Sequence, residues 1–229
     1  MKIEILADAG VVANQAAALI AEDARTAVAA RGRFVLAVSG GKTPWIMLRA
    51  LANEDVPWQK VDLLQVDERV APAGHTDRNF THLRESLLDV LPSETGLRVH
   101  PMPVESPDLE AAATSYARTL AQIAGDPPVI DLVHLGLGPD GHTASLVPGD
   151  PVLNVTDTDV ATTQVYQGRR RMTLTYRAID RARRILWLVT GADKAGPLAR
   201  LRQADHSIPA GRVRQDQALV LADCDASAT

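Results

Sequence analysis

The chain has 229 residues and 46% of them are hydrophobic, so it can bury a substantial core in one α/β domain or in a domain with a small lobe, and we expect a single domain over residues 1–229. The formal net charge of −4 shows no basic excess, which argues against a nucleic-acid partner. No apolar run approaches the roughly 20 residues of a membrane span, and no signal-peptide pattern follows Met1. We therefore expect a cytoplasmic protein with no membrane partner. The one cysteine, Cys224, cannot form an internal disulfide.

Apolar runs of strand length alternate with helical patterns along the chain. This order predicts a mostly parallel sheet with helices on both faces. Strands are expected over residues 3–6, 34–38, 61–66, 129–135, 184–189 and 218–222, and a looser region contains residues 160–165. Helices are expected over residues 11–30, 44–51, 79–91, 109–124 and 195–202.

Two helix ends carry sequence signals. Gly32 follows the alanine-rich first helix, and we expect it to end that helix as a C-cap. Thr43 precedes Pro44, so Thr43 is expected to be the N-cap of the second helix and Pro44 its first residue.

Four of the predicted strands each run into a polar motif. The motifs are SGGKTP at residues 39–44, DER at 67–69, GLGPDGH at 136–142 and TGADK at 190–194. Because the carboxyl ends of parallel strands meet at one edge of a sheet, the four loops can converge on one ligand. A functional site is therefore expected at this edge.

The SGGKTP loop has the ingredients of an anion-binding site. Gly40 and Gly41 let backbone N–H groups approach a ligand, and Ser39 and Thr43 offer hydroxyls. The helix that follows points its positive end at the loop. The spacing differs from the GxxxxGK[ST] of a nucleotide P-loop, which favours a single phosphate. An ordinary glycine turn that caps a helix is the alternative.

The GLGPDGH loop presents an acid and a histidine two residues apart. A histidine such as His142 is well suited to proton transfer near neutral pH, and Asp140 could orient it. Gly136, Gly138 and Gly141 have the GxGxxG spacing, but the loop lies mid-chain with a proline and a histidine where a helix should begin. A dinucleotide cofactor is therefore not expected. The alternative is a glycine-rich loop with an exposed histidine.

Charged residues follow the other two strands. Arg69 could hold substrate oxygens or a developing negative charge, and Lys194 stands where a second phosphate-binding cation is expected. A solvated charge cluster and an exposed lysine are the respective alternatives. We expect no metal, and we interpret the histidines without a partner at ligand spacing as structural or surface residues: His75, His82, His100, His134 and His206.

In chain order, the motifs SGGKTP, VDERV, LGLGPDGHTASLVPG, RMTLTY and VTGADKA resemble those of the 6-phosphogluconolactonase family, over about residues 5–223. The GLGPDGHTASLVPG stretch is the most specific part. The resemblance implies a Rossmann-like three-layer α/β fold, shared with glucosamine-6-phosphate deaminases. It implies hydrolysis of 6-phospho-D-glucono-1,5-lactone to 6-phospho-D-gluconate in the oxidative pentose phosphate pathway, without a cofactor. The expected partner is the small phosphosugar lactone, and we expect a monomer.

The resemblance also implies roles for residues in the motifs. By position, His142 matches the catalytic histidine of the family and Asp140 its neighbouring acid. We expect His142 to take a proton from water and return it to the ring oxygen, while Arg69 or backbone N–H groups meet the oxyanion. The residues expected to bind the phosphosugar are Ser39, Gly40, Gly41, Lys42, Thr43, Asp67, Arg171 and Lys194.

Two positions depart from the family pattern. Lys42 stands where serine or threonine is usual, so it either adds a cation to the phosphate site or points to water. Arg78 precedes Asn79 where a serine is usual, which leaves the role of that loop open.

Three other functions compete with lactone hydrolysis. An isomerase or deaminase of the same fold typically carries Phe-Asn-Glu-Pro after the histidine motif, whereas residues 144–148 here read ASLVP, without a carboxylate. A serine hydrolase could use Ser39 in the turn AVSGG as a nucleophile elbow, although alanine stands at the first position. A non-catalytic phosphosugar sensor would normally accompany a DNA-binding segment, and none is left over.

Overall fold

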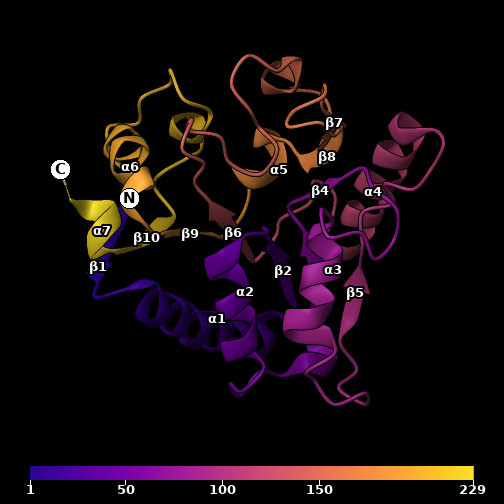
Figure 1. The fold of residues 1–229 in the computed structure, drawn as a ribbon. Helices are drawn as coiled ribbons and strands as arrows, with labels where there is room; N and C mark the ends of the chain where they lie inside the picture. The colour runs from indigo at the N-terminus through magenta and orange to yellow at the C-terminus, as the bar shows by residue number, and fades with distance from the viewer. Residues whose placement is uncertain (229) are drawn as a thin grey trace.

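The computed structural model describes residues 1–228, in which a seven-stranded sheet lies between two layers of helices (Figure 1). Every neighbouring pair of strands is parallel. The strand order is β1-β10-β9-β6-β2-β3-β5. The bounds are β1 (Lys2–Leu6), β2 (Phe34–Val38), β3 (Val61–Gln65), β5 (Arg98–His100), β6 (Leu132–Gly136), β9 (Arg184–Val189) and β10 (Ala218–Asp223). The predicted three-layer α/β class is confirmed.

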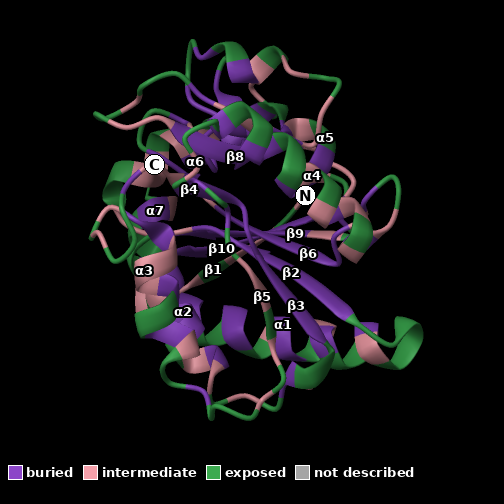
Figure 2. Cartoon of the chain, turned by 90° about the vertical axis from the view of Figure 1, so that its right-hand side faces the viewer, coloured by how far each residue is buried: buried purple, intermediate pink, exposed green. Residues whose placement is uncertain are grey.

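The helices divide between the two faces of the sheet. Their bounds are α1 (Ala9–Arg31), α2 (Lys42–Leu51), α3 (Asn79–Leu83), α4 (Leu109–Ala124), α5 (Tyr176–Ile179), α6 (Ala195–Arg202) and α7 (Cys224–Ser227). Along β2, Phe34, Leu36 and Val38 pack in the core beneath α1 and α2, whereas Val35 and Ala37 pack in the core beneath α4. Because both faces are covered, central strands such as β2 read as continuous apolar runs, and they are buried between the helices in Figure 2.

A second, antiparallel sheet lies beyond the carboxyl ends of the large one. It contains β4 (Asp67–Arg69), β8 (Arg171–Leu174) and β7 (Val160–Thr162), in the order β4-β8-β7. Figure 1 shows it beside α4 and α5. Met172 and Leu174 anchor it in the core on the α4 side. The sequence did not predict this sheet, since its strands have only three or four residues each.

Some predicted boundaries were wrong. The N-cap of α2 is Gly41, not Thr43, whose hydroxyl lies 2.6 Å from the Thr190 hydroxyl instead. The helix predicted over residues 79–91 is α3 followed by a π-helical turn over Arg84–Leu88, and it ends before Pro92, which disfavours helical backbone just ahead of it. The prediction for Gly32 is confirmed, because it ends α1 in the left-handed region with φ 74°. No helix within residues 1–228 is long and apolar enough to cross a membrane.

Candidate active site

A cavity of about 680 Å³ opens where the strands of the large sheet end. The loops that follow β2, β3, β6 and β9 all contribute to its wall, so the four polar motifs converge as expected from a parallel sheet. The predicted site residues that line it are Ser39, Gly40, Gly41, Lys42, Thr43, Asp67, Arg69, His142, Arg171 and Lys194. Asp140 is not part of the wall and lies in contact with His142.

The loop after β2 packs closely against its surroundings. A side chain at Gly40 would place its Cβ 2.1 Å from the Asn79 amide oxygen, so only glycine fits there. Gly41 has φ 137°, in the region open to glycine, and is the N-cap of α2. The bond between Thr43 and Thr190 ties this loop to the end of β9. The N-terminus of α2 therefore faces the cavity, an arrangement suited to an anion.

His134 supports the loop after β2 through a hydrogen bond from within the sheet. It is fully buried in β6, and its Nδ1 accepts the Ser39 backbone N–H at 3.2 Å. Burial lowers the pKa of His134 to about 3, so the imidazole is neutral. Within residues 1–228 no hydrogen bond joins the Ser39 hydroxyl to a histidine, so Ser39 lacks the base that a serine nucleophile needs.

His142 and Asp140 form a hydrogen-bonded pair on the loop after β6. The Asp140 Oδ1 lies 2.5 Å from the His142 Nδ1 and also accepts the His142 backbone N–H at 3.1 Å. The Tyr166 hydroxyl donates to the other carboxylate oxygen at 2.9 Å. Partial burial acts to raise the pKa of Asp140, but the charge and hydrogen bonds of His142 outweigh it and hold this pKa below its usual value. Asp140 is therefore a carboxylate at neutral pH.

Two arginines stand side by side in the small sheet. Arg69 on β4 is directly opposite Arg171 on β8, and both line the cavity. The Nε of each is buried without a hydrogen-bond partner among residues 1–228. Burial lowers the pKa of Arg171, with Arg69 adding to this effect and Asp67 opposing it. Two adjacent cations with unused donors favour an anionic ligand.

The acidic residues next to these arginines are tied to protein donors. The Asp67 carboxylate accepts the Ser145 hydroxyl at 2.5 Å and, at 3.3 Å, the Asn79 side-chain amide. Glu68 is fully buried and accepts the backbone N–H groups of Arg69, Asn79 and Phe80. These bonds shape the wall of the cavity.

The unusual Arg78 has a structural place. It is only 4% exposed, does not line this cavity, and its Nε lies 3.2 Å from the Glu68 carboxylate. It therefore balances the charge of the buried Glu68. Lys42, the other departure from the family pattern, is exposed at the start of α2 on the cavity wall. Lys194 also reaches the wall and lies 2.7 Å from Asp193.

Several polar residues of the site were not among the predicted site residues. Asn79, Thr190 and Asp223 line the cavity, and Tyr166 contacts Asp140. Asp223 ends β10, a fifth strand at the same edge, so the strand-end pattern could have identified it; both of its oxygens accept the Gly191 N–H at 3.0 Å. No group of three or more His, Cys, Asp or Glu side chains in the described part of the chain is placed to hold a metal ion.

The parallel sheet, with a glycine loop and a histidine loop at one edge, places the chain among the Rossmann-like α/β proteins. The family model for glucosamine-6-phosphate isomerases/6-phosphogluconolactonase matches residues 7–221. The chain belongs to this family.

Relatives with established names extend over most of the chain. The 6-phosphogluconolactonase of Mycobacterium tuberculosis is 38% identical over 240 residues, covering 99% of this chain and 97% of the relative. That of Synechocystis is 36% identical over 204 residues, covering 87% and 84%. The solved structure of 6-phosphogluconolactonase from Trypanosoma brucei has a TM-score of 0.85 at 26% identity, covering 99% of this chain and 97% of that one. A monomeric glucosamine-6-phosphate deaminase, at 20% identity and a TM-score of 0.82, shares the fold.

Proposed function

We propose that this protein hydrolyses 6-phospho-D-glucono-1,5-lactone to 6-phospho-D-gluconate, with His142 activating the attacking water. Its similarity to 6-phosphogluconolactonases over most of the chain identifies it as a 6-phosphogluconolactonase, which is a carboxylic ester hydrolase. The observation that carries the proposed mechanism is the 2.5 Å contact between the His142 Nδ1 and Asp140, on the wall of a cavity that also holds an anion-binding loop.

The Asp140 carboxylate determines which imidazole nitrogen is the base. With Nδ1–H donated to Asp140, the Nε2 of His142 is left with its lone pair. Nε2 takes a proton from water as the water oxygen bonds to the lactone carbonyl carbon. Arg69 or backbone N–H groups stabilise the resulting oxyanion. When the bond from this carbon to the ring oxygen breaks, the imidazolium returns the proton to that oxygen, which gives the open-chain acid.

The phosphate keeps the carbonyl carbon near His142 in this proposal. The N–H groups of the loop at residues 40–43, together with Arg171 and Lys194, hold the phosphate. Arg69, next to Arg171, remains available for the oxyanion. Fixing both ends of the substrate raises the effective concentration of the reacting groups.

A coupled assay tests this function. Glucose-6-phosphate dehydrogenase supplies the lactone, and its loss is followed at mildly acidic pH, where the spontaneous reaction is slow. We expect the protein to accelerate lactone loss well above that spontaneous rate. Loss at the spontaneous rate with folded protein would contradict the proposal.

A deaminase reaction is disfavoured by the segment after His142. Ser145 lies where that group of enzymes carries its Phe-Asn-Glu-Pro segment, and its hydroxyl donates to Asp67 at 2.5 Å. Residues 144–148 contain no carboxylate that could act on the sugar. Glucosamine-6-phosphate should therefore release no ammonia in the presence of this protein.

Lys194 and Arg171 provide a test of phosphate binding. Lys194→Ala and Arg171→Ala should each weaken the affinity for 6-phosphogluconate by about tenfold or more, and the affinity for gluconate much less. Each substitution removes a positively charged side chain that is proposed to contact the phosphate. Isothermal calorimetry measures both ligands. Lys60→Ala, an exposed lysine outside the cavity, is the matched control. Equal losses for gluconate and 6-phosphogluconate would mean that these cations act elsewhere.

Ser39 distinguishes water attack from a covalent serine mechanism. Ser39→Ala should lose about tenfold in affinity, about 1.4 kcal/mol, as expected for one hydrogen bond. A nucleophilic serine would instead lose several orders of magnitude in kcat and react with a fluorophosphonate probe. We expect no labelling of the wild type. Labelling that disappears in Ser39→Ala would overturn the proposed mechanism.

We also infer that residues 1–229 act as one domain in a monomer. In support of this, one copy of the chain supplies the glycine loop at residues 39–43, the pair His142 and Asp140, and the two arginines Arg69 and Arg171. Sedimentation of the active enzyme tests the oligomeric state.

A further inference from the structure

Tyr166 reaches the active site from the hairpin that joins β7 and β8. Its backbone N–H donates to the Arg169 carbonyl at 2.9 Å, and the Arg169 N–H returns a bond at 3.3 Å. The two residues between them, Gln167 and Gly168, have φ of 51° and 79°. Positive φ at both positions marks the tight turn whose twist matches paired strands. The hairpin therefore fixes the backbone of Tyr166 in place.

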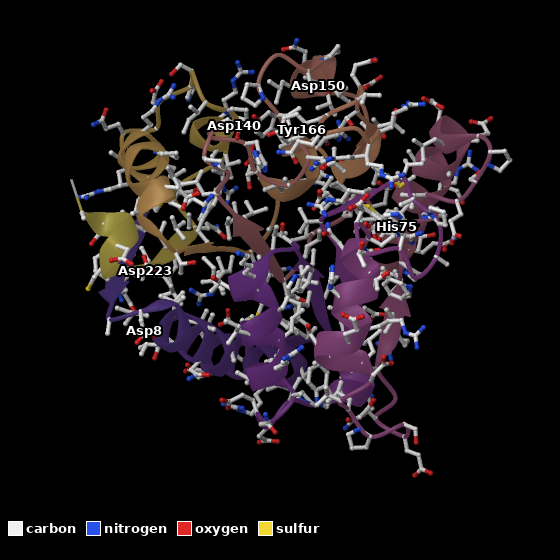
Figure 3. The ribbon with its side chains drawn as sticks, viewed as in Figure 1. Asp8, His75, Asp140, Asp150, Tyr166 and Asp223 are labelled. Atoms are coloured by element: carbon white, nitrogen blue, oxygen red, sulfur yellow. The ribbon has the colours of Figure 1, made fainter. Side chains whose placement is uncertain are left out.

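The Tyr166 hydroxyl contacts the proposed proton-transfer pair on its far side. It donates to the Asp140 Oδ2 at 2.9 Å, while Oδ1 bonds to His142. Asp140 and Tyr166 lie next to one another in Figure 3. The Tyr166 ring also meets the His142 ring edge to face, with centroids 5.6 Å apart. Both oxygens of the carboxylate thus have a partner, which restricts its rotation.

The Tyr166 ring also contacts Arg171, a cation of the proposed phosphate site. The Arg171 guanidinium carbon lies 4.9 Å from the centre of the Tyr166 ring, a cation–π contact. Gln167, in the turn, accepts from the Arg171 Nη2 at 3.1 Å. The charged or titratable groups that face Tyr166 are therefore Asp140 and His142 from one loop and Arg171 from β8. Burial, together with the Asp140 charge, raises the pKa of Tyr166, so its hydroxyl remains a donor at neutral pH.

We propose that Tyr166 is a positioning residue for lactone hydrolysis, in which its hydroxyl fixes Asp140, and through it His142, while its ring supports Arg171. The inference rests on the proposed function of the site. Asp140 is 35% exposed on a glycine-rich loop, and within the described residues its hydrogen bonds other than that from Tyr166 come from His142 itself. Tyr166 is thus the anchor from outside that loop, and it links the proton-transfer pair to the phosphate-binding side.

Tyr166→Phe separates the hydroxyl from the ring. The variant keeps the contact with Arg171, so its affinity for 6-phosphogluconate should stay within about twofold of the wild type. Its kcat should fall about fivefold, the effect of one hydrogen bond. Without this donor, Asp140 keeps more negative charge beside His142 and favours the imidazolium, so the acidic limb of the kcat profile should move to higher pH. Tyr166→Leu should in addition weaken 6-phosphogluconate binding, because the ring is lost.

Tyr176→Phe is the matched control, because it removes a tyrosine hydroxyl that donates to the Pro209 carbonyl at 2.8 Å, outside the cavity wall. Its pH profile should equal that of the wild type. An unchanged kcat and pH profile for Tyr166→Phe would overturn the proposal. Tyr166 would then contribute only through the packing of its ring.

A second measurement does not depend on activity. In histidine labelled with nitrogen-15, the His142 Nδ1–H resonance should shift in Tyr166→Phe and not in Tyr176→Phe. If the resonance shifts but the wild-type protein has no lactonase activity, the proposed function is contradicted and the contact between Tyr166 and Asp140 is supported. No shift in an active enzyme would contradict the positioning contact alone.

Discussion

His142→Asn is expected to lower kcat for lactone hydrolysis by about 10³-fold, with the fold intact. Asparagine fills part of the same space and remains polar, but it cannot accept and return a proton near neutral pH, and this step typically contributes about 10²–10⁴-fold. The coupled lactone assay measures the loss, and a thermal melt establishes that the variant is folded. Binding of 6-phosphogluconate should change little, since the proposed phosphate contacts come from other loops.

His206→Asn is the control for this variant, because His206 is exposed and lies outside the cavity wall. It should keep the wild-type rate. A folded His142→Asn enzyme with near-normal kcat would show that another group moves the proton, and the pairing of Asp140 with His142 would then have only a structural meaning.

The sequence predicted the large sheet because burial on both faces leaves a strong pattern. Phe34–Val38, a run of five apolar residues, became β2, and Arg184–Val189 became β9 with the expected bounds. The carboxyl ends of these strands then located the cavity, since parallel topology brings them to one edge. The part of the site built on strand ends was therefore within reach of the sequence.

The small sheet was out of reach because long-range pairing defines it. Asp67–Arg69 is too short to show a strand period, and nothing in the local sequence indicates that Arg69 pairs with Arg171, about a hundred positions later. Tyr166 was missed for the same reason. Its partner Asp140 belongs to another loop, and the hairpin that brings them together depends on positive φ at Gln167, a residue type that rarely adopts it.

The error at Thr43 arose from a local rule that tertiary contacts override. Threonine before proline is a good N-cap pattern, yet the helix starts one residue before Thr43, at Lys42 after Gly41. The Thr43 hydroxyl bonds to Thr190 instead, so it connects two loops of the site. Departures of this kind from local preference are expected where a binding site needs particular geometry.

Gly138→Ala is expected to lower kcat by about 10²-fold although it replaces no group that takes part in the chemistry. A Cβ at this position would lie 2.1 Å from the His142 Nδ1 and 2.2 Å from its Cε1, so the imidazole must swing away. That movement breaks the 2.5 Å contact with Asp140 and shifts the base relative to the substrate. A misplacement of about 1 Å can cost about 10²-fold in rate. The coupled assay and a thermal melt measure the two effects separately.

Gly196→Ala is the matched control for Gly138→Ala, because a Cβ at Gly196 in α6 would meet nothing within 4 Å. It should keep the wild-type kcat and gain up to about 1 kcal/mol in stability from the higher helix propensity of alanine. If Gly138→Ala is folded and fully active, the imidazole has room that the structure does not show, and its contact with Asp140 is not needed. If it is inactive, glycine at position 138 has a physical reason other than a dinucleotide, because it leaves the space that the His142 ring occupies.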